Sequence, residues 1–355
     1  TNKKLPDPVN NEDNSVPTPT PTPIPQDYTV IANDVLENRP LDTIKEKYTN
    51  TFNFNGPSYT GEPANDKTCT QVNPSPEDHQ AALKVLNFLR NLAGLSDNVV
   101  ENSEWSTDCQ DTALIIHKIG KVPSNHVIIP EFIPKTCTQG SEFIQTAVKT
   151  AALSNLAAND VSCYQSMYRF ILDEGENNRY VVGHRRSLLK PNLEKVGMGF
   201  YPVVNEPTGT ANVFNQMPAV TVLRSIDEQA KNTDELPSNI KFVSWPSAGP
   251  FPIDQLPSTW TISYSGFNEK NLANIDELNI YITRDDGTPI PFTAKLSRDI
   301  ETKDTLSLYL DPSALELCQD MRTITVRVVN DKQKYCLQYS FLLFGNKNQV
   351  DICLY

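Results

Sequence analysis

Histidine is the side chain best suited to acid–base or metal chemistry near neutral pH, because its ordinary pKa is about 6.5. The chain has four histidines, His79, His117, His126 and His184. His79 and His117 fall within predicted helices, where we expect them to face solvent or to cap a helix end. His126 and His184 lie in short polar segments between predicted elements, so they are the candidates for a functional site.

Oxygen-bearing side chains gather just before His184. Asp173, Glu174 and Glu176 surround Gly175 and precede Asn178. Carboxylate and amide oxygens are calcium ligands, but these residues lack the spacing of a known calcium loop. The pattern predicts a solvated turn.

A serine nucleophile has little support in the sequence. No G-x-S-x-G motif is present, and Ser154 stands beside Asn155 near the end of a predicted helix. Such a position lacks the elbow that exposes a nucleophilic hydroxyl. We expect Ser154 to have a structural role.

The seven cysteines contain no C-x-x-C pair and no zinc-finger spacing, which favours disulfides over a structural zinc. We expect two disulfides among the four of the first half, with all three pairings open: Cys69, Cys109, Cys137 and Cys163. The alternative is a set of buried thiols in a cytosolic protein. Disulfides would place the protein outside the cell.

Charge and hydropathy exclude several classes of protein. The chain has 31 basic and 43 acidic residues, a formal charge of −12, which disfavours nucleic acid as a partner. No apolar run approaches the roughly 20 residues that cross a bilayer. At 355 residues the chain is long enough for two domains.

Helical periodicity predicts several successive helices in the first half of the chain. Ser75-Pro76 starts the first, whose apolar stripe ends before Gly94. Later helices are predicted after Ser106, from Ser141, and after Asp160 as its cap. Runs at 196–201 and 212–223 predict strands packed on these helices.

From about residue 240 the pattern changes to short strands. Runs at 260–264, 278–283, 292–296, 306–310, 324–329 and 336–343 are separated by turn residues, and Asp285-Asp286-Gly287 predicts a hairpin. This pattern favours an all-β sandwich of immunoglobulin type. We expect an α+β chain: a Pro/Thr-rich linker over 1–27, a helical domain with an N-terminal extension over 28–230, and a β-sandwich over 240–355.

Three segments of the helical half together resemble the CAP superfamily of cysteine-rich secretory, antigen 5 and pathogenesis-related proteins. Leu86-Asn87-Phe88-Leu89-Arg90 resembles its L-N-x-x-R helix, and His126 stands at its first histidine. Residues 183–199, from Gly183-His184-Arg185 to the V-G-x-G at Val196, resemble its microbial signature. Segments around Trp245 and Trp260, which we expect to be buried, resemble a β companion domain of some members.

The resemblance implies an α-β-α sandwich with a cleft lined by two histidines and two carboxylates. His126 and His184, 58 positions apart, match the histidines, and Asp173 falls at one carboxylate. Ser154 replaces the other, as in a subgroup with S-N-L followed by Asp…Asn…G-H-R-R. The implied cleft residues are His126, Ser154, Asn155, Asp173, Asn178, His184 and Arg185.

Two neutral imidazoles facing one cleft can bind a divalent cation such as zinc, with Asp173 as third ligand or as the partner that orients a histidine. They can equally hold loop backbone by hydrogen bonds alone. The first hypothesis is a secreted or surface-tethered, non-enzymatic CAP protein that binds a small lipid, a sterol or an extracellular protein in this cleft. The alternatives are a metal-dependent hydrolase or peptidase using His126, His184 and Asp173, and a structural adhesin.

Overall fold

The computed structural model describes residues 23–62, 68–123, 125–137, 140–175, 180–207, 214–217, 219–227, 236–268, 270–297 and 305–345. Residues 1–22 of the predicted linker, Asn178 and Cys353 lie outside these ranges. The described chain is a mixed fold of helices and sheets, so the expected α+β class is confirmed at this level.

The helix-rich half contains most of the described helices. Its elements, with the short segments that precede it, are β1 (Thr29–Ile31), α1 (Asp34–Glu37), α2 (Leu41–Thr51), β2 (Tyr59–Thr60), β3 (Asn73–Pro74), α3 (Pro76–Leu92), β4 (Val100–Glu101), α4 (Ser103–Ile119), α5 (Ser141–Ala152), β5 (Ser154–Ala158), α6 (Cys163–Leu172), α7 (Gly183–Leu188), β6 (Lys195–Tyr201), β7 (Val204–Pro207), β8 (Phe214–Met217) and β9 (Val220–Arg224).

Local capping explains where these helices begin. The Ser75 hydroxyl accepts a hydrogen bond from the Asp78 amide at the start of α3, as its sequence predicts. Helix α4 begins three residues before the predicted Ser106, because Asn102 accepts from the Trp105 amide. The cap of α6 is Ser162, and the prediction of Asp160 there was wrong: Asp160 accepts instead from the Ser166 hydroxyl within the helix.

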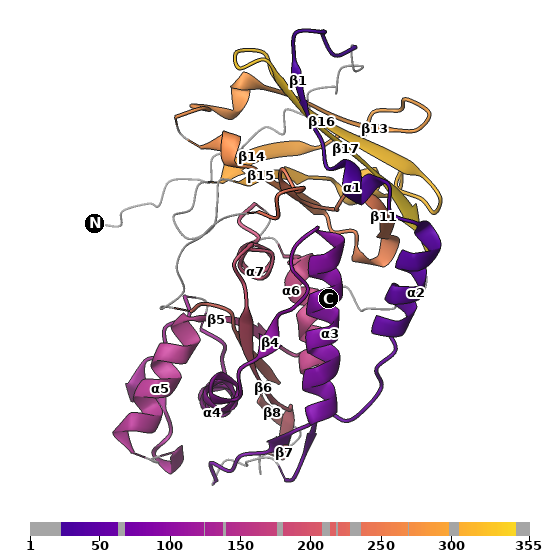
Figure 1. Ribbon diagram of the computed structural model, residues 1–355. Helices are drawn as coiled ribbons and strands as arrows, with labels where there is room; N and C mark the ends of the chain where they lie inside the picture. Colours follow the sequence, from indigo (N-terminus) through magenta and orange to yellow (C-terminus); the bar gives the residue numbers. More distant parts are fainter. Residues whose placement is uncertain are drawn as a thin grey trace, which may run out of the picture.

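A four-stranded sheet in the order β4-β6-β9-β5 forms the centre of this half, with α3 and α6 on one face and α4 and α5 on the other (Figure 1). Strand β6 carries Gly199 where α4 crosses it. A Cβ atom there would lie 2.3 Å from the Cys109 carbonyl carbon, so only glycine permits this close approach. Strand β5 was not predicted, and the predicted run 212–223 is divided between β8 and β9.

The second half contains two sheets with an apolar core between them. Its elements are β10 (Val243–Trp245), β11 (Gly249–Pro252), β12 (Thr259–Ser263), β13 (Leu278–Arg284), β14 (Thr293–Ser297), β15 (Thr305–Tyr309), α8 (Pro312–Leu315), β16 (Thr323–Asn330) and β17 (Tyr335–Phe344). One sheet has the order β10-β12-β15-β14, and the other contains β1, β17, β16 and β13, with β11 also paired to β17.

Aromatic side chains fill the space between these two sheets. The rings of Trp260 on β12 and Phe341 on β17 lie edge to face with centroids 5.3 Å apart. Trp245 and Trp260 are fully buried, which confirms the expectation of core packing. The predicted hairpin turn at Asp285-Asp286-Gly287 forms, since Thr283 of β13 pairs with Pro289 in an antiparallel bridge. The predicted partner run is wrong, because β14 belongs to the other sheet.

The two halves are connected at several points. Strand β1 pairs in parallel with β17, so residues 29–31 belong to the sheet of the second half although they precede the helices. Helix α2 contacts β11, and the Tyr48 hydroxyl donates to the Asp254 carboxylate. Buried apolar side chains form one cluster that extends from α3 into both sheets of the second half.

The cysteine prediction is correct for one bond and wrong for the other. Cys69 and Cys137 form a disulfide, whereas Cys109 and Cys163 are free and buried, on α4 and at the start of α6. Burial raises the pKa of the Cys109 thiol to about 12. Within the described part of the chain, no helix combines the length and apolar character needed to span a membrane.

Candidate functional site

Asp173 and His184 form the centre of the predicted site. Asp173 ends α6 in the left-handed conformation, with φ of 50°, and its carboxylate is buried. One carboxylate oxygen lies 2.8 Å from His184 Nδ1, and the other accepts from the Arg185 amide at 3.2 Å. An ionised carboxylate at Nδ1 fixes the proton on that nitrogen and leaves Nε2 as the acceptor atom of the neutral imidazole.

Arg185 is a buried cation that joins the two halves. Its guanidinium donates to the carbonyls of Ile171 at 2.5 Å and Leu172 at the end of α6, and to the carbonyl of Thr259 on β12 at 2.6 Å. Burial lowers the pKa of Arg185 to about 10. Arg185 therefore anchors α7 between α6 and the β-rich half.

His126 and Ser154 meet at the start of β5. His126 Nδ1 lies 2.8 Å from the Ser154 carbonyl oxygen, while the Ser154 hydroxyl donates to the Thr150 carbonyl at 2.6 Å. The hydroxyl is thus engaged with its own helix end, as expected for a structural serine.

Asn155 connects this segment to α7. Its amide donates to the Ser187 hydroxyl at 2.9 Å, and Ser187 in turn contacts the His184 carbonyl at 2.8 Å. His126 and His184 are therefore linked through consecutive residues of β5, His126 directly and His184 through Ser187. A cleft shared by the two imidazole rings stays a prediction.

Among the described residues, no three His, Cys, Asp or Glu side chains are grouped so that they could hold a metal ion. Asp173 instead contacts Nδ1 of His184, where a carboxylate can orient the histidine ring. Asn178, the remaining residue of the implied cleft, lies outside the described ranges.

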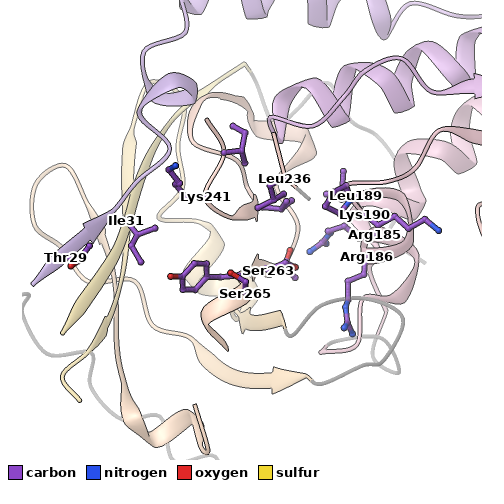
Figure 2. A pocket seen from close by; sticks show the side chains of 15 residues that line it. Thr29, Ile31, Arg185, Arg186, Leu189, Lys190, Leu236, Lys241, Ser263 and Ser265 are labelled. Atoms are coloured by element: carbon purple, nitrogen blue, oxygen red, sulfur yellow. The ribbon is translucent and has the colours of Figure 1, made fainter. Parts of the chain in front are cut away.

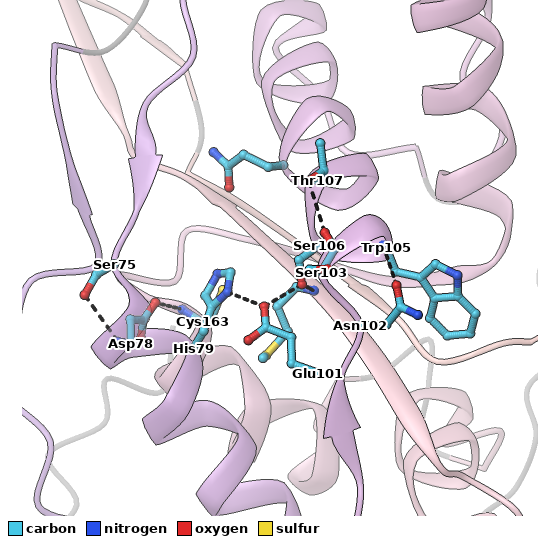
Figure 3. A network of polar contacts seen from close by, with 12 residues as sticks. Ser75, Asp78, His79, Glu101, Asn102, Ser103, Trp105, Ser106, Thr107 and Cys163 are labelled. Carbon is cyan, nitrogen blue, oxygen red and sulfur yellow. Dashed lines mark hydrogen bonds and ion pairs between the residues drawn. The ribbon is translucent and has the colours of Figure 1, made fainter.

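The two histidines that we expected to face solvent or cap a helix end, His79 and His117, are buried, so that prediction was wrong. His117 is completely buried in α4, and His79 is 5% exposed. His79 Nδ1 lies 2.7 Å from the Glu101 carboxylate, which also accepts from the Ser106 hydroxyl at 2.6 Å (Figure 3). Burial by itself would raise the pKa of Glu101, but the hydrogen bonds from His79 and Ser106 lower it below its usual value.

Asp78 lies beside His79 and was also missed by the sequence reading. Its fully buried carboxylate accepts from the amides of Cys163 at 2.8 Å and Tyr164 at 2.9 Å, at the first turn of α6 (Figure 3). Burial raises the pKa of Asp78, and these two hydrogen bonds oppose the rise. A carboxylate at a helix N-terminus is also favoured by the helix dipole, so Asp78 fixes α6 against α3.

A cavity of about 540 Å³ lies where the two halves meet, and we name it the junction cavity (Figure 2). Strand β1 forms one side, with Thr29 and Ile31, and α7 with the residues after it forms the opposite side. Apolar lining side chains come from three segments of the chain: Ile31, Leu189, Pro191, Leu236, Ile240 and Val243. Hydroxyl groups line it through Thr261 and Ser263 of β12 and the adjoining Tyr264 and Ser265.

The charged side chains among the described lining residues of the junction cavity are all cationic. Its described lining residues include four cationic side chains, Arg185, Arg186, Lys190 and Lys241, and no carboxylate. The chain as a whole carries a formal charge of −12. Among the described residues of the implied CAP cleft, only Arg185 lines this cavity. Sequence reasoning missed the others because they come from segments far apart in the chain.

Comparison with known proteins gives no independent assignment: no family model, no curated protein and no solved structure matches this chain. The resemblance to the CAP superfamily therefore rests on the motifs in residues 86–90, 126 and 183–199.

Proposed function

We propose that this chain is a secreted or surface-tethered binding protein of the CAP type, whose ligand is a small lipid or sterol. The observation that carries the proposal is the junction cavity. Its volume of about 540 Å³ lies within the range of roughly 300–1,000 Å³ typical of ligand sites. Apolar walls with a few hydroxyl groups suit an amphipathic molecule.

In this proposal the histidine region supports the binding site and does not itself bind the ligand. Asp173 and Arg185 hold α7 and the segment after it, and this segment supplies Leu189 and Pro191 to the cavity wall. The engaged hydroxyl of Ser154 argues against a serine hydrolase. The disulfide between Cys69 and Cys137 supports an extracellular location.

Strand β1 offers a matched pair of variants to test the site. Ile31 lines the cavity, whereas its neighbour Val30 is 54% exposed on the other face of the strand. We expect Ile31→Trp to fill part of the cavity and weaken binding at least tenfold, about 1.4 kcal/mol, while Val30→Trp binds as the wild type does. Native mass spectrometry with a sterol, dodecanol and dodecanoate measures the affinities.

Two results would contradict the proposal. One is that the wild-type protein binds none of these molecules. The other is that Ile31→Trp and Val30→Trp bind them equally well. The metal-dependent hydrolase is tested on the same preparations with an ester and peptide panel, with and without zinc. Turnover that disappears in His126→Ala with His184→Ala would favour that alternative.

A further inference from the structure

We propose that residues 127–134, which we name the apolar loop, dock this protein onto a lipid surface with zwitterionic headgroups such as phosphatidylcholine. The loop lies between α4 and α5, and the described lining of the junction cavity includes none of its residues. Figure 1 shows α5 on the side of the helix-rich half away from the sheets of the second half. The inference therefore does not rest on the proposed ligand of the cavity.

The apolar loop exposes three large side chains over a short stretch of chain. Val127 is 51% exposed, Ile129 44% and Phe132 64%. Exposed apolar side chains that form one contiguous patch mark an interaction site, whereas scattered ones do not. The arrangement of these three side chains therefore decides what the exposure means.

The backbone places the three side chains on one side of the loop. The Phe132 amide donates to the Ile129 carbonyl at 3.0 Å in a turn of 3-10 helix over Pro130–Phe132. This helix repeats every three residues, so the side chains of Ile129 and Phe132 align. Ile128, between Val127 and Ile129 in an extended segment, points the other way into the apolar core and is 2% exposed.

Both ends of the apolar loop are fixed to the rest of the fold. Just before it, His126 Nδ1 lies 2.8 Å from the Ser154 carbonyl oxygen. Just after it, Cys137 forms the disulfide with Cys69. A loop held at both ends presents its apolar side chains in a preformed arrangement, so docking costs little conformational entropy.

The main chain of the loop suits a lipid better than a peptide partner. Pro130 and Pro134 have no amide hydrogen, and the amides of Phe132 and Ile133 already donate within the loop, to the carbonyls of Ile129 and Pro130. Little main-chain hydrogen bonding to water is therefore lost when the loop enters a lipid headgroup region. An extended peptide would instead need free main-chain groups with which to pair.

The charges beside the loop indicate which lipid it meets. From residue 121 to residue 142 the chain has two lysines and two glutamates, all exposed: Lys121, Glu131, Lys135 and Glu142. This local balance contrasts with the formal charge of −12 for the whole chain. A zwitterionic headgroup offers a phosphate to the lysines and a trimethylammonium group to the glutamates. An anionic surface repels Glu131 within the loop and the protein as a whole.

Cosedimentation of the full chain with phosphatidylcholine vesicles tests the inference. Ile129→Ser with Phe132→Ser removes two exposed side chains of the loop, and we expect it to lower the partition coefficient by about tenfold or more. Val161→Ser with Met321→Ser is the matched control, because these side chains are 69% and 52% exposed elsewhere. The control should bind vesicles as the wild type does, and so should Ile31→Trp, which alters only the cavity.

A fluorescence measurement keeps the test independent of the folding of the double variant. Phe132→Trp places a reporter in the loop, whereas the natural tryptophans are each 7% exposed or less. We expect its emission to shift to shorter wavelength when phosphatidylcholine vesicles are added, and that of Met321→Trp to stay unchanged.

The headgroup preference is tested by replacing one third of the phosphatidylcholine with phosphatidylserine. We expect the wild type to bind these vesicles about fivefold more weakly, the effect of one charge close to an anionic surface. Glu131→Gln should reduce the difference, and added salt should reduce it further because salt screens the charges.

Four results would overturn the inference. These are no binding of the wild type to phosphatidylcholine, equal losses in the two serine double variants, tighter binding to phosphatidylserine, and a wild-type dimer in lipid-free sedimentation that Ile129→Ser with Phe132→Ser abolishes. The last would assign the loop to a second copy of this chain. Binding to the junction cavity is measured with different variants, so it can stand or fail separately.

Discussion

Two histidine–carboxylate pairs in the helical half have nearly the same hydrogen bond but opposite exposure. In the pair of His184 and Asp173, the side chain of the histidine is 26% exposed and that of the acid 1%. In the pair of His79 and Glu101, the corresponding values are 6% and 29%. The Nε2 atom of His79 is buried and has no hydrogen-bond partner among the described residues.

This difference teaches that a histidine paired with a carboxylate is not by itself a functional site. The imidazole must also reach solvent or a ligand, as that of His184 does. The pair of His79 and Glu101 connects α3 to β4, and the acid of the pair faces outward. Three predictions test the contrast between the buried acid, Asp173, and the buried imidazole of His79.

The largest effect is expected at Arg185, beside the buried acid. Arg185→Leu leaves three carbonyls without their donor and removes a cation close to Asp173, so we expect a loss of about 3–5 kcal/mol in the free energy of unfolding. Arg322→Leu, which breaks an exposed pair with Asp285, should cost about 1 kcal/mol or less. Urea unfolding of both variants measures the difference, and equal losses would contradict the anchoring role of Arg185.

An effect of intermediate size is expected when the two acids of these pairs, Asp173 and Glu101, are changed to amides. Asp173→Asn replaces one of two acceptor oxygens with an NH2 donor, so either His184 Nδ1 or the Arg185 amide loses its acceptor in a buried site, and we expect a loss of about 2 kcal/mol. Glu101→Gln retains an acceptor in a partly exposed position and should cost about 1 kcal/mol. Chemical denaturation near pH 7 gives both values. A larger loss for Glu101→Gln would reverse the proposed order.

The smallest effect is a pH dependence of the His79 pair. Because the folded-state pKa of Glu101 lies below its ordinary value of 4.5, its stabilising contribution is complete above that pH. The contribution is lost as the pH falls through the folded-state pKa. The difference in unfolding free energy between the wild type and Glu101→Gln should therefore be larger at pH 6 than at pH 3.

Asp78, in the same region, should affect the pH dependence of stability in the opposite direction to Glu101. Burial raises its pKa above 3.8, so its contribution favours folding at low pH and is lost as the pH rises through the folded-state pKa. The difference between the wild type and Asp78→Asn should accordingly change with pH in the opposite direction. Parallel slopes for the two variants would mean that the hydrogen bonds of Glu101 do not control its titration.

Much of the fold could be predicted from local patterns. The apolar stripe and the Ser75 cap placed α3, and a glycine in the left-handed conformation, Gly120, ends α4. Strand β5 was missed because Ser154 and Asn155 have low strand propensity, and the strand forms by pairing with β9. That pairing is a long-range contact that local periodicity does not contain.

The candidate site was less predictable than the helices. The burial of His79 has a signal in the sequence, since it lies three residues before Ala82 and seven before Leu86 on the same helical stripe. The contact of Arg185 with Thr259 and the junction cavity have no such signal. The first joins residues 74 positions apart, and the second gathers residues from Thr29 to Ser265.

Strand β1 also constrains the order in which this protein can be completed during synthesis. Thr29 pairs with Tyr335, a partner that leaves the ribosome some 300 residues later. The helical layers can assemble while translation continues, but the parallel pairing of β1 with β17 must wait for almost the entire described chain. Until then the main-chain amides and carbonyls of β1 have no β17 partner and stay open to other extended segments.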